Sequence, residues 1–367
     1  MLLDFFQYRM GVTSLAVDPQ SLAFHMRTTW LQYALSDPCL FHTILFYASA
    51  RLDTNQGERS QSTVTLHHHT QAVNRINRRL ASEKVELDDS LIASVALLAM
   101  HACVANDPSA MEIHIRGMMS MVHAKGGLKN LGFAGSLVDM VYMVKIFSTI
   151  LASANTLDIE TASSCPPPAP LIASIIHRAQ LNSIKFSTSS LVIPLFQEIH
   201  DASPCLEDFY TGRKPLYEWR KAHNANVDEN ASTHPGPVSG QNLPPPIHDD
   251  IIYAACKAAT RIFWYLVDGC SPFSNKALSY LSLNLKRALA ATDLAQWTCF
   301  AQEALIWVCA VGAAVSQAAD ESWWFIMRGG AIVMSTSLIR GSVMEESWFA
   351  FWWLRGLYWR RVKGGGI

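Results

Sequence analysis

The sequence lacks closely spaced cysteines. Its eight cysteines stand at positions 39, 103, 165, 205, 256, 270, 299 and 309, so none belongs to a Cys-x-x-Cys pair. Tetrahedral thiolate zinc sites need ligands a few residues apart, and disulfide frameworks are typical of small secreted domains. The spacing therefore predicts buried, reduced thiols, with neither a disulfide framework nor a cysteine-bound metal.

An excess of one charge and a long apolar run are also missing. Lys and Arg total 29 against 30 Asp and Glu, a formal net charge of −1, which gives no overall attraction to nucleic acid or to an acidic membrane surface. The longest apolar run, residues 304–316, is shorter than the ~20 residues that cross a bilayer. The charged residues Asp4 and Arg9 interrupt the N-terminal stretch in which a signal peptide would have its apolar core. We expect an intracellular protein with no membrane partner; a membrane protein is the alternative.

Signals for β-hairpins are absent as well, since no Asn-Gly or Asp-Gly separates alternating apolar runs. Half of the 367 residues are hydrophobic, enough for a large core, and the apolar residues recur at helical spacing. The sequence therefore predicts an all-α protein: a multi-helical array of antiparallel helices, with a Pro-rich, partly disordered insertion in the middle.

Composition divides the chain into three regions. Residues 1–162 are expected to form an N-terminal helical half. Residues 163–246 form a Pro-rich variable or linker region, with short helices at 171–180 and 206–222 and a polar stretch at 224–246 that we expect to be disordered. Residues 247–367 form a C-terminal helical half, with helices expected over 250–267, 275–291 and 297–319 before a Trp-rich end.

The clearest single element covers residues 108–132. Asp107 is a good N-cap, Pro108 suits the first helical position, and the pair Gly126-Gly127 ends the helix. Gly117 breaks the pattern, because an interior glycine costs roughly 1 kcal/mol relative to alanine. We therefore expect Gly117 to face a neighbouring helix at close range.

This element resembles a motif of the regulatory domain of fungal-specific transcription factors, His-x-Arg-Gly-x-x-x-Met-Val-x-x-x-Gly-Gly-Leu. The matching residues are His114, Arg116, Gly117, Met121, Val122, Gly126, Gly127 and Leu128. Residues 37–53 resemble the opening helix of the same domain, and residues 304–328 with the stretch ESWFAFWWL resemble its C-terminal third. The resemblance spans about residues 37–354, and it implies a helical, non-enzymatic regulatory domain.

The chain departs from that family at its N-terminus. The family binds DNA through an N-terminal cluster in which six closely spaced cysteines hold two zinc ions, whereas no cysteine precedes Cys39 here. The resemblance implies the regulatory part without the DNA-binding module, through loss of the module or truncation of the gene product. We expect a transcription-factor-like regulatory or interaction protein, nuclear or otherwise cytoplasmic.

Its expected partners are proteins, either a related transcription factor or a second copy of the chain. A small-molecule effector is a further possible partner, and no sequence-specific DNA binding is expected of this chain alone. Two other functions stay open at this point. One is a helical receptor for a small apolar metabolite, and the other is an enzyme built on an unrecognised helical site.

No catalytic, cofactor-binding or metal-binding residue is predicted. His67, His68 and His69 are consecutive, so on a helix they point about 100° apart, whereas helical metal pairs need a spacing of three or four residues. The triplet is interpreted as a solvated polar patch. Four other histidines stand isolated among apolar neighbours and are expected to be hydrogen-bonded core or boundary residues: His25, His42, His101 and His114.

Two groups of basic residues and one group of tryptophans complete the candidates. The first, Arg75 with Arg78 and Arg79, is interpreted as a solvated helix face rather than a nucleic-acid contact, because acidic residues follow it. The second fits either a nuclear-import signal or an ordinary charged terminus: Arg355, Arg360, Arg361 and Lys363. The tryptophans are expected to pack between the last helices, with a partner or ligand surface as the alternative: Trp323, Trp324, Trp348, Trp352, Trp353 and Trp359.

Overall fold

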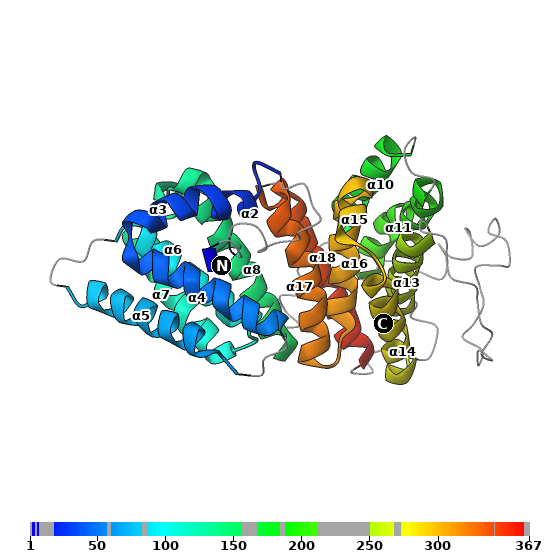
Figure 1. Ribbon diagram of the computed structural model, residues 1–367. Coiled ribbons are helices and arrows are strands. Elements are labelled where there is room, and N and C mark those ends of the chain that lie inside the picture. Colours follow the sequence, from blue (N-terminus) through cyan, green and yellow to red (C-terminus); the bar gives the residue numbers. More distant parts are fainter. Residues whose placement is uncertain are drawn as a thin grey trace, which may run out of the picture. The chain divides into compact units, whose positions relative to one another are not determined.

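The computed structural model of the protein describes residues 2–3, 6, 18–56, 60–82, 87–155, 167–183, 188–210, 250–267, 273–340 and 342–362. All regular structure in these ranges is helical, and they contain no strand (Figure 1). The all-α prediction is therefore confirmed. The stretch at 224–246, for which we predict disorder, lies outside the described residues.

Short helical segments precede the longer helices of the N-terminal part: α2 (Leu22–His25), the π-helical turn η1 (Met26–Trp30), α3 (Leu31–Ser36), α4 (Pro38–Asn55), α5 (Thr63–Leu80), α6 (Asp89–Val104), α7 (Pro108–Ala124), the 3-10 turns η2 (Leu128–Asn130) and η3 (Phe133–Gly135), and α8 (Ser136–Asn155). The remaining helices are α10 (Ala169–Leu181), α11 (Thr188–Tyr210), α13 (Asp250–Val267), α14 (Asn275–Ala290), α15 (Leu294–Phe300), α16 (Gln302–Val315), α17 (Ala319–Ser335), the 3-10 turn η4 (Ser337–Arg340) and α18 (Ser342–Val362).

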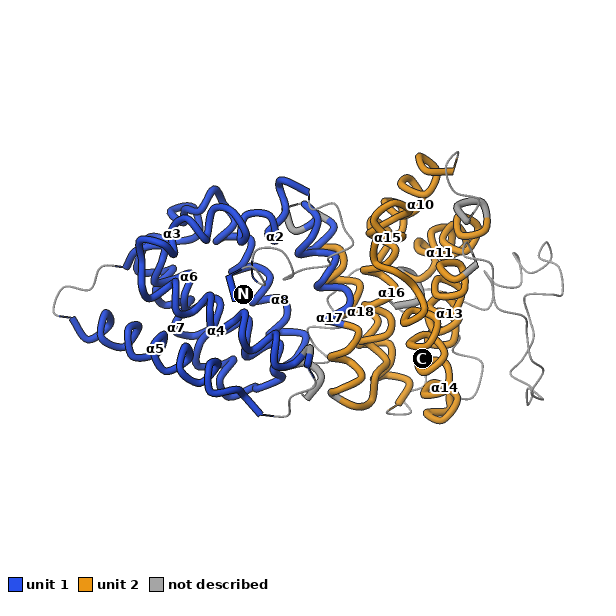
Figure 2. Tube along the Cα trace, in the orientation of Figure 1, with its two compact units in different colours: residues 1–156, 326–344 blue, residues 157–325, 345–367 orange. Residues whose placement is uncertain are grey.

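Packing divides the chain into two compact units (Figure 2). Unit 1 comprises residues 1–156 and 326–344, and unit 2 comprises residues 157–325 and 345–367. Helix α17 therefore begins in unit 2 and ends in unit 1, and α18 begins in unit 1 and continues in unit 2. The division of the sequence into three regions stays a prediction about domains.

Helix α6 is the most deeply buried helix of unit 1. It packs against α4, α5, α7 and α8, and nearly every residue from Ser90 to Cys103 is buried. Its apolar residues leave no polar face. Because each fully buried Leu or Ile side chain contributes about 1.5–3 kcal/mol, this helix supplies much of the core of the unit.

Helix α7 follows most of the predicted pattern, but Gly117 does not. The Asp107 side chain caps the first turn of α7, and Met118 and Val122 are buried as expected. Gly117 is exposed, however, and a Cβ built there would meet nothing within 4 Å. The prediction of a close helix contact at Gly117 is wrong, because the buried side of α7 runs through Met111 and Met118 instead.

One stretch of unit 1, Phe133–Leu151, is long and apolar enough to cross a membrane by length and composition alone. Half of its most apolar window is buried within the protein, where α8 packs against α6 and α7. Asp139 and Lys145 interrupt it, so it contains no long unbroken apolar run. Since the core helix of a soluble protein passes the same test, this stretch is weak evidence for a membrane span.

In unit 2, α13 and α16 pack against one another and against α14, and α11 and α10 extend the same array. The expected helix over 250–267 is α13. The single helix expected over 297–319 is wrong, since Ala301 adopts an extended conformation (φ −163°, ψ 95°) between α15 and α16. Asp293 and Gln296 form a reciprocal capping box at the start of α15, which gives this short helix its own N-terminus.

The Trp-rich end contributes mainly to the core. Trp352 and Trp353 are 4% and 1% exposed, and the ring of Trp353 stacks on Phe263 of α13 with 5.9 Å between centroids. Trp348 and Trp359 are only half-buried. The expectation of core packing therefore holds for the most buried of these rings.

Candidate functional site

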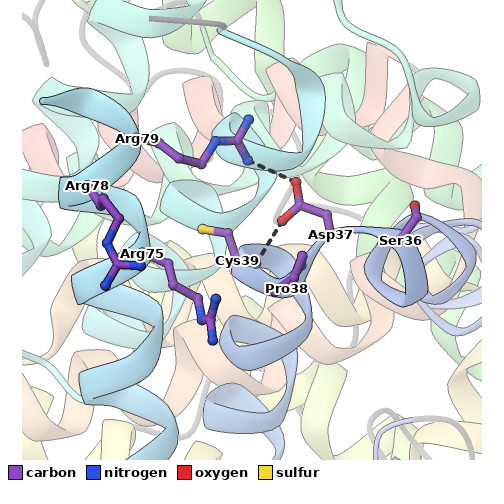
Figure 3. A pocket seen from close by; sticks show the side chains of 7 residues that line it. All are labelled: Ser36, Asp37, Pro38, Cys39, Arg75, Arg78 and Arg79. Atoms are coloured by element: carbon purple, nitrogen blue, oxygen red, sulfur yellow. Dashed lines mark hydrogen bonds and ion pairs between the residues drawn. The ribbon is translucent and has the colours of Figure 1, made fainter. Parts of the chain in front are cut away.

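A cavity of about 200 Å³ lies in unit 1 where the end of α3 and the start of α4 meet α5 (Figure 3). It is lined by Ser36, Asp37, Pro38, Cys39, Arg75, Arg78 and Arg79. Sites for drug-sized ligands typically measure ~300–1,000 Å³. This cavity is smaller, so its size suits a small polar group.

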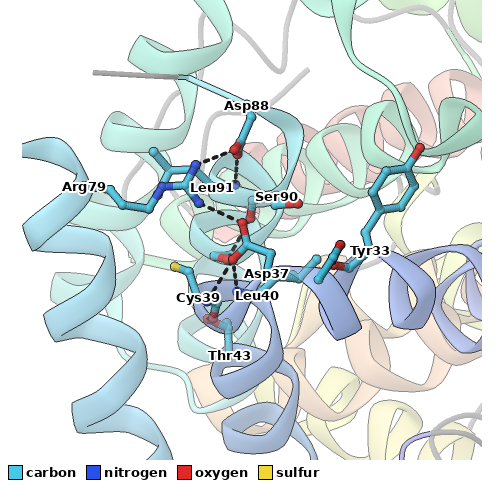
Figure 4. Close-up of polar contacts among 11 residues, drawn as sticks. Tyr33, Asp37, Cys39, Leu40, Thr43, Arg79, Asp88, Ser90 and Leu91 are labelled. Carbon is cyan, nitrogen blue, oxygen red and sulfur yellow. Dashed lines mark hydrogen bonds and ion pairs between the residues drawn. The ribbon is translucent and has the colours of Figure 1, made fainter. Parts of the chain in front are cut away.

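Asp37 fixes the start of α4. Its Oδ1 accepts hydrogen bonds from the backbone N–H groups of Cys39, at 2.8 Å, and Leu40, at 3.0 Å (Figure 4). Pro38 follows in the first helical position, where a missing N–H leaves nothing unsatisfied. The first donors of α4 are therefore occupied by a side chain of the protein itself.

Arg79 connects Asp37 to the cap of a second helix. Its Nη1 lies 2.8 Å from Asp37 Oδ2, and its Nη2 donates to Asp88 Oδ2 (Figure 4). Asp88 is the N-cap of α6, where its Oδ1 accepts from Leu91 N at 2.8 Å. One guanidinium group of α5 thus joins the first turns of α4 and α6.

The charge of Arg79 is secured by these partners. Burial lowers the pKa of its guanidinium group, but the hydrogen bond and charge of Asp88 and the charge of Asp37 raise it by more. The net pKa is raised, so Arg79 is permanently positive. Burial also raises the pKa of the Cys39 thiol at the same cavity, which keeps it protonated and a poor nucleophile.

Arg75 and Arg78 complete the wall of the cavity, and Figure 3 shows both on the α5 side of it. Neither forms an ion pair with any residue that the structure describes. Nε of Arg75 is buried without a hydrogen-bond partner there, whereas Arg78 is exposed. The interpretation of these arginines as a plain solvated face missed the cavity, because its other wall comes from residues 36–39, far away in the sequence.

The structure gathers several histidines that the sequence analysis treated separately. Nδ1 of His42 in α4 lies 3.1 Å from Nδ1 of His68 in α5. The rings of His69 and His101 each lie 4.6 Å from the ring of Phe46, between centroids. His42 and His101 are therefore not isolated, because α4, α5 and α6 bring these side chains together.

Five histidines of unit 1 favour the neutral form of the imidazole ring. Burial is the largest cause in each case, and it lowers the pKa of His42, His68, His69 and His114. For His101, burial and the charges of neighbouring groups lower the pKa to about 4. Within the described residues, no group of three or more His, Cys, Asp or Glu side chains is placed to hold a metal ion. The expectation of a metal-free protein stays a prediction.

The C-terminal basic group is integrated into unit 2. Arg355 is 4% exposed, and its Nη1 donates to the backbone carbonyls of Ala314, at 2.8 Å, and Ser316, at 3.0 Å. Arg361 lies over the ring of Phe273, 5.5 Å from its centroid. A receptor for nuclear import could not reach Arg355 without unfolding this end, and Lys363 lies outside the described residues.

Comparison with known proteins decides the family. A family model described as the fungal specific transcription factor domain matches residues 2–343. The chain belongs to this family. Searches among curated proteins and among solved structures gave no match. The family is one of transcription regulators, and its members are generally not enzymes.

In this fungal transcription factor domain, the motif residues of α7 and the turn after it have structural roles. Met121 and Val122 are buried in the core. Gly126 and Gly127 both have positive φ, +93° and +96°, which only glycine adopts at little cost. Lys125, just before them, pairs with Asp89 at 2.6 Å. The motif therefore determines how α7 ends and places the end of α7 beside the start of α6.

Proposed function

We propose that this chain regulates transcription in the nucleus through contacts with other proteins, without recognising a DNA sequence itself. The family match over residues 2–343 carries the proposal. Two features of the 367 residues support it: the near-zero net charge and the lack of any Cys-x-x-Cys pair. Base recognition needs side chains held against base edges and cations against phosphates. Among the arginines of α5, Arg79 is already paired with Asp37 and Asp88.

The proposed partners are a related transcription factor that carries a zinc cluster, or a second copy of this chain. Such a partner would supply the DNA contacts, and this chain would modify the activity of the complex. Catalysis is not part of the proposal, because the family is regulatory. The Cys39 thiol at the cavity is also kept protonated by burial.

A small-molecule effector is the second candidate, and the structure favours a polar one. The Trp-rich end, where an apolar metabolite was the alternative, buries Trp352 and Trp353 against the core. The cavity beside α4 is lined by arginines instead. An effector that binds there would carry negative charge.

The proposal is tested by selecting DNA from a random library with the purified chain at physiological salt. We expect no enriched motif, because salt-sensitive contacts to phosphates alone carry no sequence information. A full-length relative with the six-cysteine cluster serves as the matched positive control. Enrichment of one motif with a preference of ~10³-fold or more, as specific binders show, would contradict the proposal. Imaging of a fluorescent fusion tests the nuclear location.

A further inference from the structure

The cavity beside α4 is lined by more cationic than anionic side chains. Three guanidinium groups and one carboxylate line it. Both oxygens of that carboxylate are engaged, since Asp37 Oδ1 accepts from two backbone N–H groups and Oδ2 accepts from Arg79. The charges of Arg75 and Arg78 are therefore left without a carboxylate partner within the described residues.

The three arginines are also close to one another along α5. Arg75 is three residues from Arg78 and four from Arg79, so all three occupy neighbouring positions on α5, where like charges repel. The charge of Arg75 reaches His42 on α4, whose pKa it helps to lower after burial. A bound anion would relieve this repulsion and give the buried Nε of Arg75 a partner.

We propose that this cavity binds a phosphate group, either free phosphate or the phosphate of a small phosphorylated metabolite, held by Arg75 and Arg78. Guanidinium groups offer planar, paired donors that match phosphate oxygens. A phosphate monoester carries about −1.5 to −2 charges near pH 7, which matches the two arginines without a carboxylate partner. Arg79 lies beside them and keeps Asp37 neutralised.

The surrounding charge selects against extended polyanions. The cavity of about 200 Å³ is large enough for a phosphate group. Asp88, whose side chain is 48% exposed, lies on the far side of Arg79 and would repel an extended polyanion such as DNA. The bound phosphate would be held by the C-terminal half of α5 and would face the start of α4, where the N–H groups of Cys39 and Leu40 already donate to Asp37.

The test is isothermal titration calorimetry on the full chain at pH 7.5, with chloride adjusted to hold the ionic strength constant. The probes are inorganic phosphate and free phosphoserine. The test variant is R75Q/R78Q, and R78Q alone is a second variant that removes only an exposed side chain. The matched control is R116Q, because Arg116 is an exposed arginine of the same unit that pairs with Glu112.

We expect saturable binding to the wild-type chain and to R116Q, with the Kd at least tenfold weaker in R75Q/R78Q and weakened in R78Q. Tighter binding of phosphoserine would identify a phosphate monoester as the ligand, and equal or tighter binding of phosphate would identify the free ion. No saturable heat with either probe, or the same Kd in R75Q/R78Q as in the wild type, would overturn the proposal. No transcription assay enters this test, so it stands apart from the proposed regulatory role.

Discussion

Units 1 and 2 both have apolar cores, but they differ in the contacts that join their helices in the two clearest cases. In unit 1, charged side chains join the ends of helices, as when Arg79 of α5 binds Asp37 at the start of α4. In unit 2, aromatic rings meet in the middle of helices, as when Trp353 of α18 stacks on Phe263 of α13. Electrostatic contacts depend on pH and salt, whereas buried aromatic area does not. Unit 1 should therefore respond to solution conditions more than unit 2.

Each unit also handles a buried ionisable group in its own way. Unit 1 keeps His101 neutral, with its Nδ1 buried and without a hydrogen-bond partner among the described residues. Unit 2 buries Arg355, and the Nη1 of this side chain donates hydrogen bonds to two backbone carbonyl groups. Acidification protonates His101 and so removes the first arrangement. The hydrogen bonds of Arg355 persist over the whole physiological pH range. Four substitutions and one change of pH sharpen this comparison.

The largest effect is expected from Trp353→Ala in unit 2. Trp353 is 1% exposed, and removing a buried tryptophan leaves a cavity and costs about 3–5 kcal/mol. Chemical denaturation followed by circular dichroism measures the loss. Phe349→Ala is the matched control, because Phe349 lies on the same helix but is 41% exposed, and it should cost under about 1 kcal/mol. Equal losses in the two variants would show that the Trp-rich end is not core.

Acidification should weaken unit 1 next. The pKa of His101 falls from 6.5 to about 4 on folding, so the unfolded chain binds the proton more readily. His101 therefore contributes stability at pH above 6.5, which is lost as the pH falls from 6.5 to about 4. At 1.36 kcal/mol per pKa unit, the loss is about 3 kcal/mol. His42, His68 and His69 shift in the same direction.

His101→Phe isolates that contribution. After burial, the charges that lower the His101 pKa are those of His69, Arg51 and His114, while Asp107 raises it. Phenylalanine cannot be protonated, so the free energy of unfolding of the variant should fall less between pH 6.5 and 4. Denaturation curves at the two pH values give the difference. An unchanged pH dependence would mean that other groups cause the acid loss.

A smaller effect is expected from Arg79→Gln. The substitution leaves Asp37 and Asp88 without their shared guanidinium, and both are partly exposed, at 17% and 48%. Water therefore screens them, and the cost should be about 1–2 kcal/mol. In the control Arg116→Gln, the lost partner Glu112 is 72% exposed, and the cost should stay below about 0.5 kcal/mol. Thermal unfolding would contradict this account if both variants melted alike.

The smallest effect is a gain of stability from Gly117→Ala. Gly117 lies on the exposed side of α7 with open space around its Cα, so alanine adds helix propensity without a clash. The free energy of unfolding should rise by about 0.5–1 kcal/mol. A decrease in the melting temperature would restore the original expectation that Gly117 packs against another helix.

The sequence rules for caps and helical spacing predicted the features that depend on neighbouring residues. The cap at Asp107 and the extent of α13 follow from side chains within a few residues of one another. The close glycine contact was placed wrongly, because one such contact occurs at Gly330, where a Cβ would meet the ring of Phe147. Nothing near Gly330 in the sequence identifies that partner on α8.

The candidate site escaped prediction for the same reason. The sequence shows the arginines of α5 on one helix face, but Asp37, the partner of Arg79, comes from the start of α4. The histidines behave alike, because His42 and His68 meet only after α4 and α5 pack together. Contacts between helices depend on crossing geometry and side-chain directions, which spacing in one sequence does not encode.

The central claim is that this chain regulates transcription through protein contacts. The most direct test fuses it to a heterologous DNA-binding module in fungal cells and measures a reporter gene downstream of that module's site. The account predicts that the fusion changes reporter expression several-fold relative to the module alone, and that Trp353→Ala, which disrupts the core of unit 2, removes the change. Reporter expression equal to that of the module alone, with the fusion present in matched amounts and bound at the site, would contradict it.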